Sequence, residues 1–163
     1  MKATTLLVRQ HNKVKAIFKK LEKGGSGANA LVDELSNDLC AHMIIEQEIF
    51  YPAVKKIDES LIREAYEEHA MAELSLKRLR GCDPKDPSFK AHVTATKELI
   101  EHHVKEEEED LFPKVEKKLG AELLEELGAT MSARFDEVVS LGFDASVPKG
   151  FIKTSSDLSV LQL

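Results

Sequence analysis

Apolar residues recur every three or four positions along most of this chain, the spacing of one face of an α-helix. The pattern predicts helices over residues 3–23, 28–56, 59–80, 87–119 and 121–140. Sustained alternation of apolar and polar residues, which would indicate β-strands, does not occur. The sequence therefore predicts an all-α protein.

Turn-forming residues mark the ends of these helices. The run Gly24-Gly25-Ser26-Gly27 ends the first helix, and Gly120 ends the fourth. Asp58 stands where an N-cap of the third helix is expected, and Pro87 suits the first turn of the fourth. Short connections make neighbouring helices antiparallel, so the first four helices predict an up-down-up-down four-helix bundle.

The helical pattern is lost at Gly142. We therefore expect residues 1–141 to form one domain, a four-helix bundle with an appended fifth helix. Residues 142–163 are expected to form an irregular C-terminal tail.

Composition narrows the class of protein. The chain has 163 residues, 32% of them charged, and a net charge of −6, which argues against a nucleic-acid partner. No apolar run is long enough to cross a membrane, and the first residues lack the apolar core of a secretory signal. Cys40 and Cys82 belong to no CxxC motif, so reduced thiols and a cytoplasmic location are expected.

The histidines and glutamates that could form a functional site belong to an internal repeat. His42 and Glu46 recur as His103 and Glu107, 61 residues later, and a proline follows each histidine by ten residues. These prolines, at positions 52 and 113, fall inside predicted helices, where a missing N–H and a steric clash predict kinks. A histidine and a glutamate four residues apart lie on one helix face.

The first and third helices repeat as well, because His11 precedes Leu21 by the same ten residues that separate His69 from Leu79. The unit of one helix with a histidine and one helix with His-x3-Glu therefore occurs twice. In a four-helix bundle, both units would direct their side chains into one interior. The candidate ligands are His11, His42, Glu46, His69, His103 and Glu107.

Two buried carboxylates without partners would cost several kcal/mol each. Only Lys15 lies near the apolar stripe to neutralise them. A metal cation removes this cost, and imidazole with carboxylate suits zinc, iron, manganese or copper. Histidines on both sides of two carboxylates indicate two metals bridged by those carboxylates.

Two neighbouring residues offer alternatives. His102 has the same spacing to Glu106 that His103 has to Glu107, but its neighbours are mostly polar and the repeat aligns His103 with His42. His102 is therefore expected to lie outside the site or in solvent. A phenolate ligand from Tyr51 is conceivable, although its position on an α-helix favours ordinary packing.

These motifs resemble the hemerythrin family, specifically the bacterial HHE cation-binding domains. The resemblance covers about residues 4–119 and rests on His11, His42-Met43-Ile44-Ile45-Glu46 with Phe50-Tyr51-Pro52, Glu67-Glu68-His69, and His103-Val104-Lys105-Glu106-Glu107 with Leu111-Phe112-Pro113. It implies two non-haem irons bridged by Glu46 and Glu107, with an oxo or hydroxo group between them.

The chain departs from oxygen-carrying hemerythrins where Glu73 replaces a second histidine one turn after His69. Without that imidazole, two coordination positions on the irons stay open to peroxide, NO or water unless Glu73 binds. An added carboxylate would instead favour ferric iron. In both cases reversible oxygen carriage is not expected.

The resemblance implies a cytoplasmic protein that reacts with O2, H2O2 or NO, with a catalase-like or an iron or nitrosative-stress role. Whether it turns over a substrate is left open. The alternative is an iron- or oxygen-responsive sensor or interaction module, whose fifth helix and tail would contact an unidentified protein partner. A structural zinc bundle is a third interpretation. No nucleic-acid or membrane partner is expected.

Overall fold

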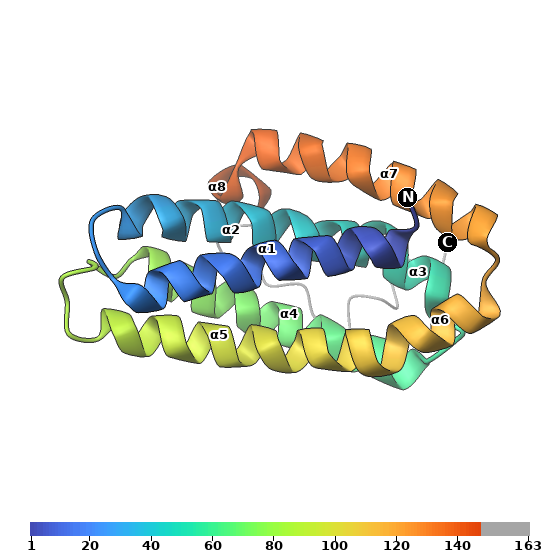
Figure 1. Cartoon of the computed structure of the whole chain (residues 1–163), viewed down its shortest axis with the longest axis horizontal. Coiled ribbons are helices and arrows are strands. Elements are labelled where there is room, and N and C mark those ends of the chain that lie inside the picture. Colours follow the sequence, from blue (N-terminus) through green and yellow to red (C-terminus); the bar gives the residue numbers. More distant parts are fainter. Residues whose placement is uncertain (148–163) are drawn as a thin grey trace.

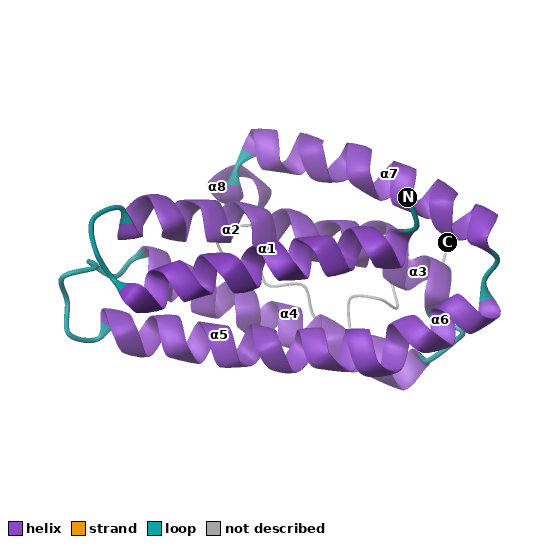
Figure 2. Ribbon diagram, in the orientation of Figure 1, coloured by secondary structure: helices purple, strands orange, loops and turns teal. Residues whose placement is uncertain are grey.

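Four helices lie side by side in the structure, a computed structural model that describes residues 1–147. They are α1 (Ala3–Lys23), α2 (Ala28–Ile45), α4 (Glu59–Arg80) and α5 (Phe89–Glu106). α1 packs against α2 and α5, and α4 packs against the same two helices, in alternating directions (Figure 1). The described part of the chain contains helices and loops and no strand (Figure 2), so the predicted all-α bundle is confirmed.

A fifth long helix, α7 (Ala121–Leu141), lies along α1 and α2. Its bounds agree closely with the predicted 121–140. The short helix α8 (Phe143–Ser146) follows where the sequence predicts the start of an irregular tail. It forms because the Phe143 ring is buried in the core and its N–H donates to Asn37 Oδ1 at 2.8 Å. The remainder of the predicted tail, residues 148–163, lies outside the described residues.

The second and fourth predicted helices each contain a wider, π-helical turn. η1 (Glu46–Phe50) leads into α3 (Tyr51–Val54), and η2 (Glu107–Leu111) leads into α6 (Phe112–Lys118). Each π turn comes directly before a helix whose second residue is proline, which cannot donate to the previous turn and clashes with it. The wider turn relieves the clash, and the path from α5 into α6 changes direction there (Figure 1).

Two apolar clusters fill the bundle on either side of its middle. One cluster includes Val14, Leu39 and Leu76, and the other includes Leu7 and Phe50. Each large side chain that is fully buried contributes roughly 1.5–3 kcal/mol to stability. The histidines and glutamates of the internal repeat lie in the polar band between the clusters.

The helix ends agree in part with the turn signals. Asp58 caps α4 as predicted, accepting a hydrogen bond from the Leu61 N–H at 3.2 Å. Pro87 lies in the connection, since α5 begins at Phe89 and the predicted start is two residues early. No helix within residues 1–147 combines the length and apolar character needed to cross a bilayer.

Candidate metal centre

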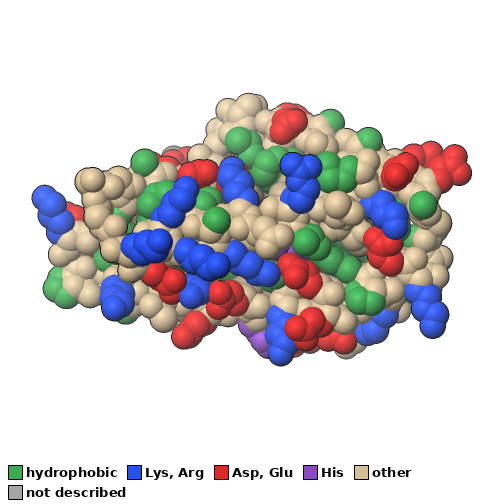
Figure 3. Space-filling model, in the orientation of Figure 1, with side chains coloured by type: hydrophobic (Ala, Val, Ile, Leu, Met, Phe, Trp, Pro, Cys, Tyr) green, Lys and Arg blue, Asp and Glu red, His purple; other side chains and the backbone are tan. Residues whose placement is uncertain are grey.

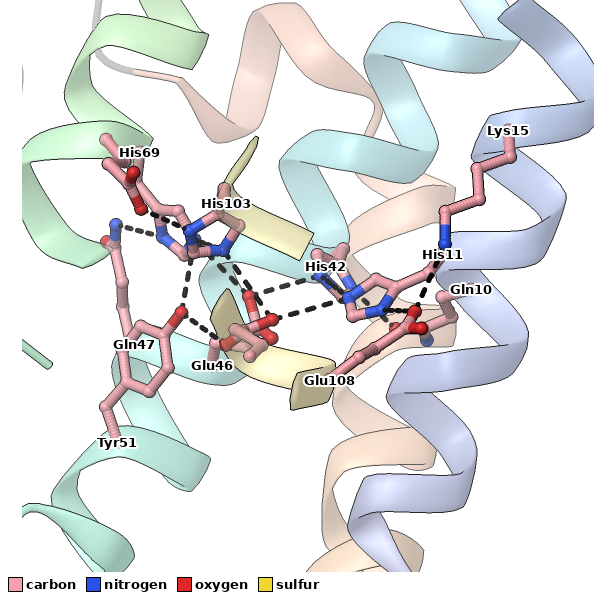
Figure 4. A network of polar contacts seen from close by, with 12 residues as sticks. Gln10, His11, Lys15, His42, Glu46, Gln47, Tyr51, His69, His103 and Glu108 are labelled. Carbon is pink, nitrogen blue, oxygen red and sulfur yellow. Dashed lines mark hydrogen bonds and ion pairs between the residues drawn. The ribbon is translucent and has the colours of Figure 1, made fainter. Parts of the chain in front are cut away.

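The six side chains of the internal repeat converge midway along the bundle (Figure 4). His11 from α1 faces His42 from α2, with 3.2 Å between their Nε2 atoms. On the opposite side, His69 from α4 faces His103 from α5, with 3.0 Å between Nε2 atoms. All four imidazoles are buried. The structure therefore contains two separate histidine pairs.

The two glutamates lie between the histidine pairs and contact both. Glu46 Oε2 lies 3.2 Å from His42 Nε2 and 3.4 Å from His69 Nε2. Glu107 Oε2 lies 3.4 Å from His11 Nε2 and 3.6 Å from His103 Nε2. Each carboxylate thus touches one imidazole of each pair, which is the arrangement that a bridging ligand requires.

The unpaired oxygens of these carboxylates test whether metal ions fit. Glu46 is 0% exposed and Glu107 is 1% exposed. Within residues 1–147, both oxygens of Glu46 and Oε2 of Glu107 are buried and have no hydrogen-bond partner. Buried, unpaired carboxylate oxygens are strongly destabilising, and cations held with the adjacent imidazoles would satisfy them. The residues present therefore fit metal ions.

Each imidazole also has a polar partner on its outer side. With Nε2 facing the glutamates, Nδ1 points away from the centre toward a carboxylate or an amide. Such outer contacts orient an imidazole and adjust its basicity as a metal ligand. The Nδ1 distances are 2.9 Å for His11 to Glu108, 2.8 Å for His42 to Gln10, 3.0 Å for His69 to Gln47 and 2.7 Å for His103 to Glu68.

These outer partners follow the repeat, although sequence reasoning did not identify them. Gln10 and Glu68 each precede a repeat histidine, His11 and His69, and each contacts the histidine of the next helix. Gln47 and Glu108 similarly follow Glu46 and Glu107 by one residue. Their occurrence at matching repeat positions was the sequence signal that could have found them.

Burial shifts the pKa of three side chains in the metal-free centre. It lowers the pKa of His42 and His69 well below the usual value, and neighbouring imidazoles lower both further. These two rings are therefore neutral and able to bind metal. Burial, and then the nearby charge of Glu107, raises the pKa of Glu46 well above its usual value.

Tyr51 reaches the centre, contrary to the packing role that its helical phase favoured. Its hydroxyl donates to Glu107 Oε1 at 2.9 Å and lies 3.3 Å from His69 Nε2. In an α-helix, a residue five positions after Glu46 would be rotated by about 140°. The π turn η1 brings Tyr51 back toward the Glu46 face, because hydrogen bonds there join residues five apart.

The structure separates the remaining candidates from the converging ligands. His102 is exposed on α5, whereas His103 is buried, in agreement with the choice made from the repeat. Glu73 lies one turn after His69 but does not belong to the grouped ligands of the centre. It lines a separate cavity of about 260 Å³ with Arg134 and Val138.

A small cavity adjoins the histidine pairs on the side away from η1 and η2. Its volume is about 10 Å³, roughly the space of one water-sized molecule. The four imidazoles line it together with apolar side chains from all four bundle helices, including Val14, Leu39, Ala72 and Ile100. The arrangement can therefore receive a very small molecule beside the four imidazoles.

Comparison with known proteins agrees with this geometry. The model of the hemerythrin HHE cation-binding domain matches residues 2–115. The chain belongs to this family. The HHE match spans the four-helix bundle and both histidine pairs, and it ends before α7.

Two relatives extend the comparison. A crystal structure of a hemerythrin HHE cation-binding domain-containing protein from Mycobacterium kansasii is 29% identical, with a TM-score of 0.76. That alignment covers 86% of this HHE protein and 88% of the other chain. A protein from a Nostoc species named DNA nickase is 29% identical over 118 residues, which are 71% of this chain and 34% of that protein. The chain thus spans about a third of the Nostoc relative.

Proposed function

We propose that this HHE protein holds two non-haem irons, one at each histidine pair, and reacts with small oxygen or nitrogen species in the cytoplasm. The observation that carries the proposal is that Glu46 and Glu107 each contact both pairs. Di-iron proteins with four-helix bundles use the same ligand types, imidazoles and glutamates projecting inward from several helices. An oxo or hydroxo group would complete the bridge between the irons.

The bound irons would supply one-electron chemistry at the centre. The protein's own residues prepare the site. The outer partners fix the imidazoles with Nε2 inward, and Glu46 and Glu107 hold the two positions together. Tyr51 holds a proton at Glu107 Oε1, where it can be shared with a molecule bound nearby.

The cavity limits the substrate class. A space of about 10 Å³ beside the imidazoles, roughly that of one water molecule, favours the smallest oxygen and nitrogen species over an organic substrate. For peroxide, the reaction would be disproportionation, in which two H2O2 give two H2O and one O2. The net charge of −6 does not favour DNA as a substrate, although the Nostoc relative is named DNA nickase.

Metal analysis and an optical spectrum of aerobically purified protein test the metal assignment. Two irons per chain with near-ultraviolet absorption typical of an oxygen-bridged ferric pair are expected. Colourless protein with zinc and no iron would replace this proposal with the structural zinc bundle. Oxygen release from added H2O2 then tests turnover, with zinc-loaded protein as the matched control. Iron-loaded protein that releases no oxygen would contradict the catalase-like role.

A second candidate function is a sensor that reports metal occupancy through α7. The observation favouring it is the paired contact between Arg134 of α7 and Glu48 of η1, at 2.9 and 3.3 Å. Glu48 lies two residues after Glu46, so the short segment η1 contains both a proposed metal ligand and the residue that contacts α7. Limited proteolysis of metal-free and iron-loaded protein tests this function. Identical digestion of the α7 region in both states would contradict it.

A further inference from the structure

A second group of metal-binding side chains lies on the outer face of α4 and α5. It consists of Glu68, His102 and Glu106, whose nearest donor atoms all lie within 4.8 Å of one another. His102 Nε2 lies 3.5 Å from Glu68 Oε1 and 3.6 Å from Glu106 Oε1. We call these three residues the outer cluster. Figure 3 shows histidine atoms at the surface over the middle of α5, next to basic and acidic side chains.

The outer cluster repeats the chemistry of the inner centre one residue earlier in the chain. Glu68, His102 and Glu106 directly precede His69, His103 and Glu107. The same His-x3-Glu spacing therefore occurs twice on α5, once facing inward and once facing outward. In the other half of the bundle, the residues that precede the inner ligands are Gln10, Ala41 and Ile45, which cannot form such a cluster.

The charge of the outer cluster favours a cation. Glu106 Oε2 is buried and has no hydrogen-bond partner in residues 1–147. Glu64 lies close enough to add a further negative charge. The recorded ion pairs of Glu68 and Glu106 are to histidines, and none is to a Lys or Arg of the described residues.

The cluster is open to solvent on one side and joined to the inner centre on the other. The His102 side chain is 62% exposed, that of Glu106 is 26% exposed and that of Glu68 is 12% exposed. Glu68 directs Oε1 toward His102, while its Oε2 lies 2.7 Å from Nδ1 of His103. One carboxylate thus contacts the outer cluster and a ligand of the inner centre.

We propose that the outer cluster is a third metal site, which takes a divalent first-row cation such as Fe²⁺ from solution before the ion enters the inner centre. One imidazole and two carboxylates suit such ions, and water would complete their coordination. The loading role rests on the proposed di-iron function, whereas binding at the outer cluster does not. An ion held there would contact Glu68 Oε1, and the other oxygen of the same carboxylate contacts His103, a candidate ligand of the inner centre.

Zinc binding to metal-free protein, measured by equilibrium dialysis, tests the site without iron chemistry. Wild type should bind three Zn²⁺ per chain, and His102→Ala and Glu106→Gln should bind two. His92→Ala is the matched control, because His92 is the one histidine outside both groups, and it should keep three. Failure of the inner centre would lower all counts equally, whereas failure of the outer cluster would remove the difference of one.

The loading role is tested by anaerobic Fe²⁺ uptake. His102→Ala should take up iron several-fold more slowly than wild type and His92→Ala, and should reach the same final content. Equal zinc counts for wild type and His102→Ala, or equal uptake rates, would overturn the proposal.

Discussion

The α1–α2 half of the bundle and the α4–α5 half present matching inner ligands in different surroundings. Phe112 and Tyr51 occupy the same repeat position, 61 residues apart. The Phe112 ring stacks on His11, with 6.0 Å between ring centroids and 8° between planes. Tyr51 instead directs its hydroxyl toward Glu107 and His69. One histidine pair thus faces an apolar ring, and the other faces a tyrosine hydroxyl.

The outer partners of the imidazoles do not create this difference. Each histidine pair has one ring backed by a carboxylate, from Glu108 or Glu68, and one backed by an amide, from Gln10 or Gln47. Carboxylate contacts raise the basicity of a ligating imidazole more than amide contacts do. Because both halves have one of each, we infer that the two ions differ mainly through Tyr51 and the outer cluster.

The largest expected effect is the loss of a bridging carboxylate. Glu46→Gln and Glu107→Gln should each reduce the iron content from two per chain to a small fraction, because each carboxylate contacts both histidine pairs. Metal analysis of the purified variants measures this loss. The two variants should lose iron to the same extent. If one variant kept one iron per chain and the other kept none, the two halves would bind iron independently.

Without metal, Glu46→Gln should instead raise the stability of the protein. The pKa of Glu46 is raised above 4.5 in the folded state by burial and then by Glu107, so its stabilising contribution is complete below about pH 4.5 and is lost as pH rises. Glu46→Gln is neutral at every pH and avoids this loss. At neutral pH, metal-free Glu46→Gln should exceed metal-free wild type in unfolding free energy by about 1–4 kcal/mol. Urea denaturation from pH 4.5 to 7 checks this, and a constant difference would contradict it.

A smaller effect is expected where α7 covers the α1–α2 half. A methyl group at Gly128 would lie 2.9 Å from the Ala3 backbone nitrogen and closer still to the Met1 carbonyl oxygen. Gly128→Ala should therefore lower the unfolding free energy by about 1–3 kcal/mol while the iron content stays at two. Gly120→Ala is the control, because nothing lies within 4 Å of its added methyl group. Equal stability of the two variants in urea denaturation would show that α7 shifts without cost.

Much of the site geometry was available from the sequence because the repeat preserves helical phase. A spacing of four positions from histidine to glutamate gives about one helical turn, so both side chains had to share a face. The offset of 61 residues then aligned His103, rather than His102, with His42. The buried position of His103 in the structure agrees with that alignment. Apolar periodicity and turn residues likewise predicted the observed bounds of α1 and α4.

The remaining features depend on the change of phase at the π turns and on contacts between distant segments. Pro52 and Pro113 predicted kinks, whereas the structure has a π turn before each proline. A π turn rotates the residues that follow it to a different helix face from the one that a kinked α-helix would give. The prediction that Tyr51 only packs in the core assumes a continuous α-helix through η1 and is therefore wrong. Helix α8 was missed for another reason, since its four residues are too few for periodicity and it depends on burial of Phe143.

The smallest expected change in stability tests the asymmetry itself. Tyr51→Phe gives both halves phenylalanine at the same repeat position and removes the hydrogen bond to Glu107, at a cost of about 1 kcal/mol. Mössbauer spectra of iron-loaded wild type should contain two ferric components, one for each environment, because only one histidine pair lies beside a tyrosine hydroxyl. Tyr51→Phe should keep two irons and bring the components together. Tyr66→Phe is the matched control, since the Tyr66 hydroxyl donates to the Gln47 carbonyl oxygen at 3.0 Å and does not reach the metal positions. Two components that persist unchanged in Tyr51→Phe would mean that the outer cluster, rather than Tyr51, makes the irons different.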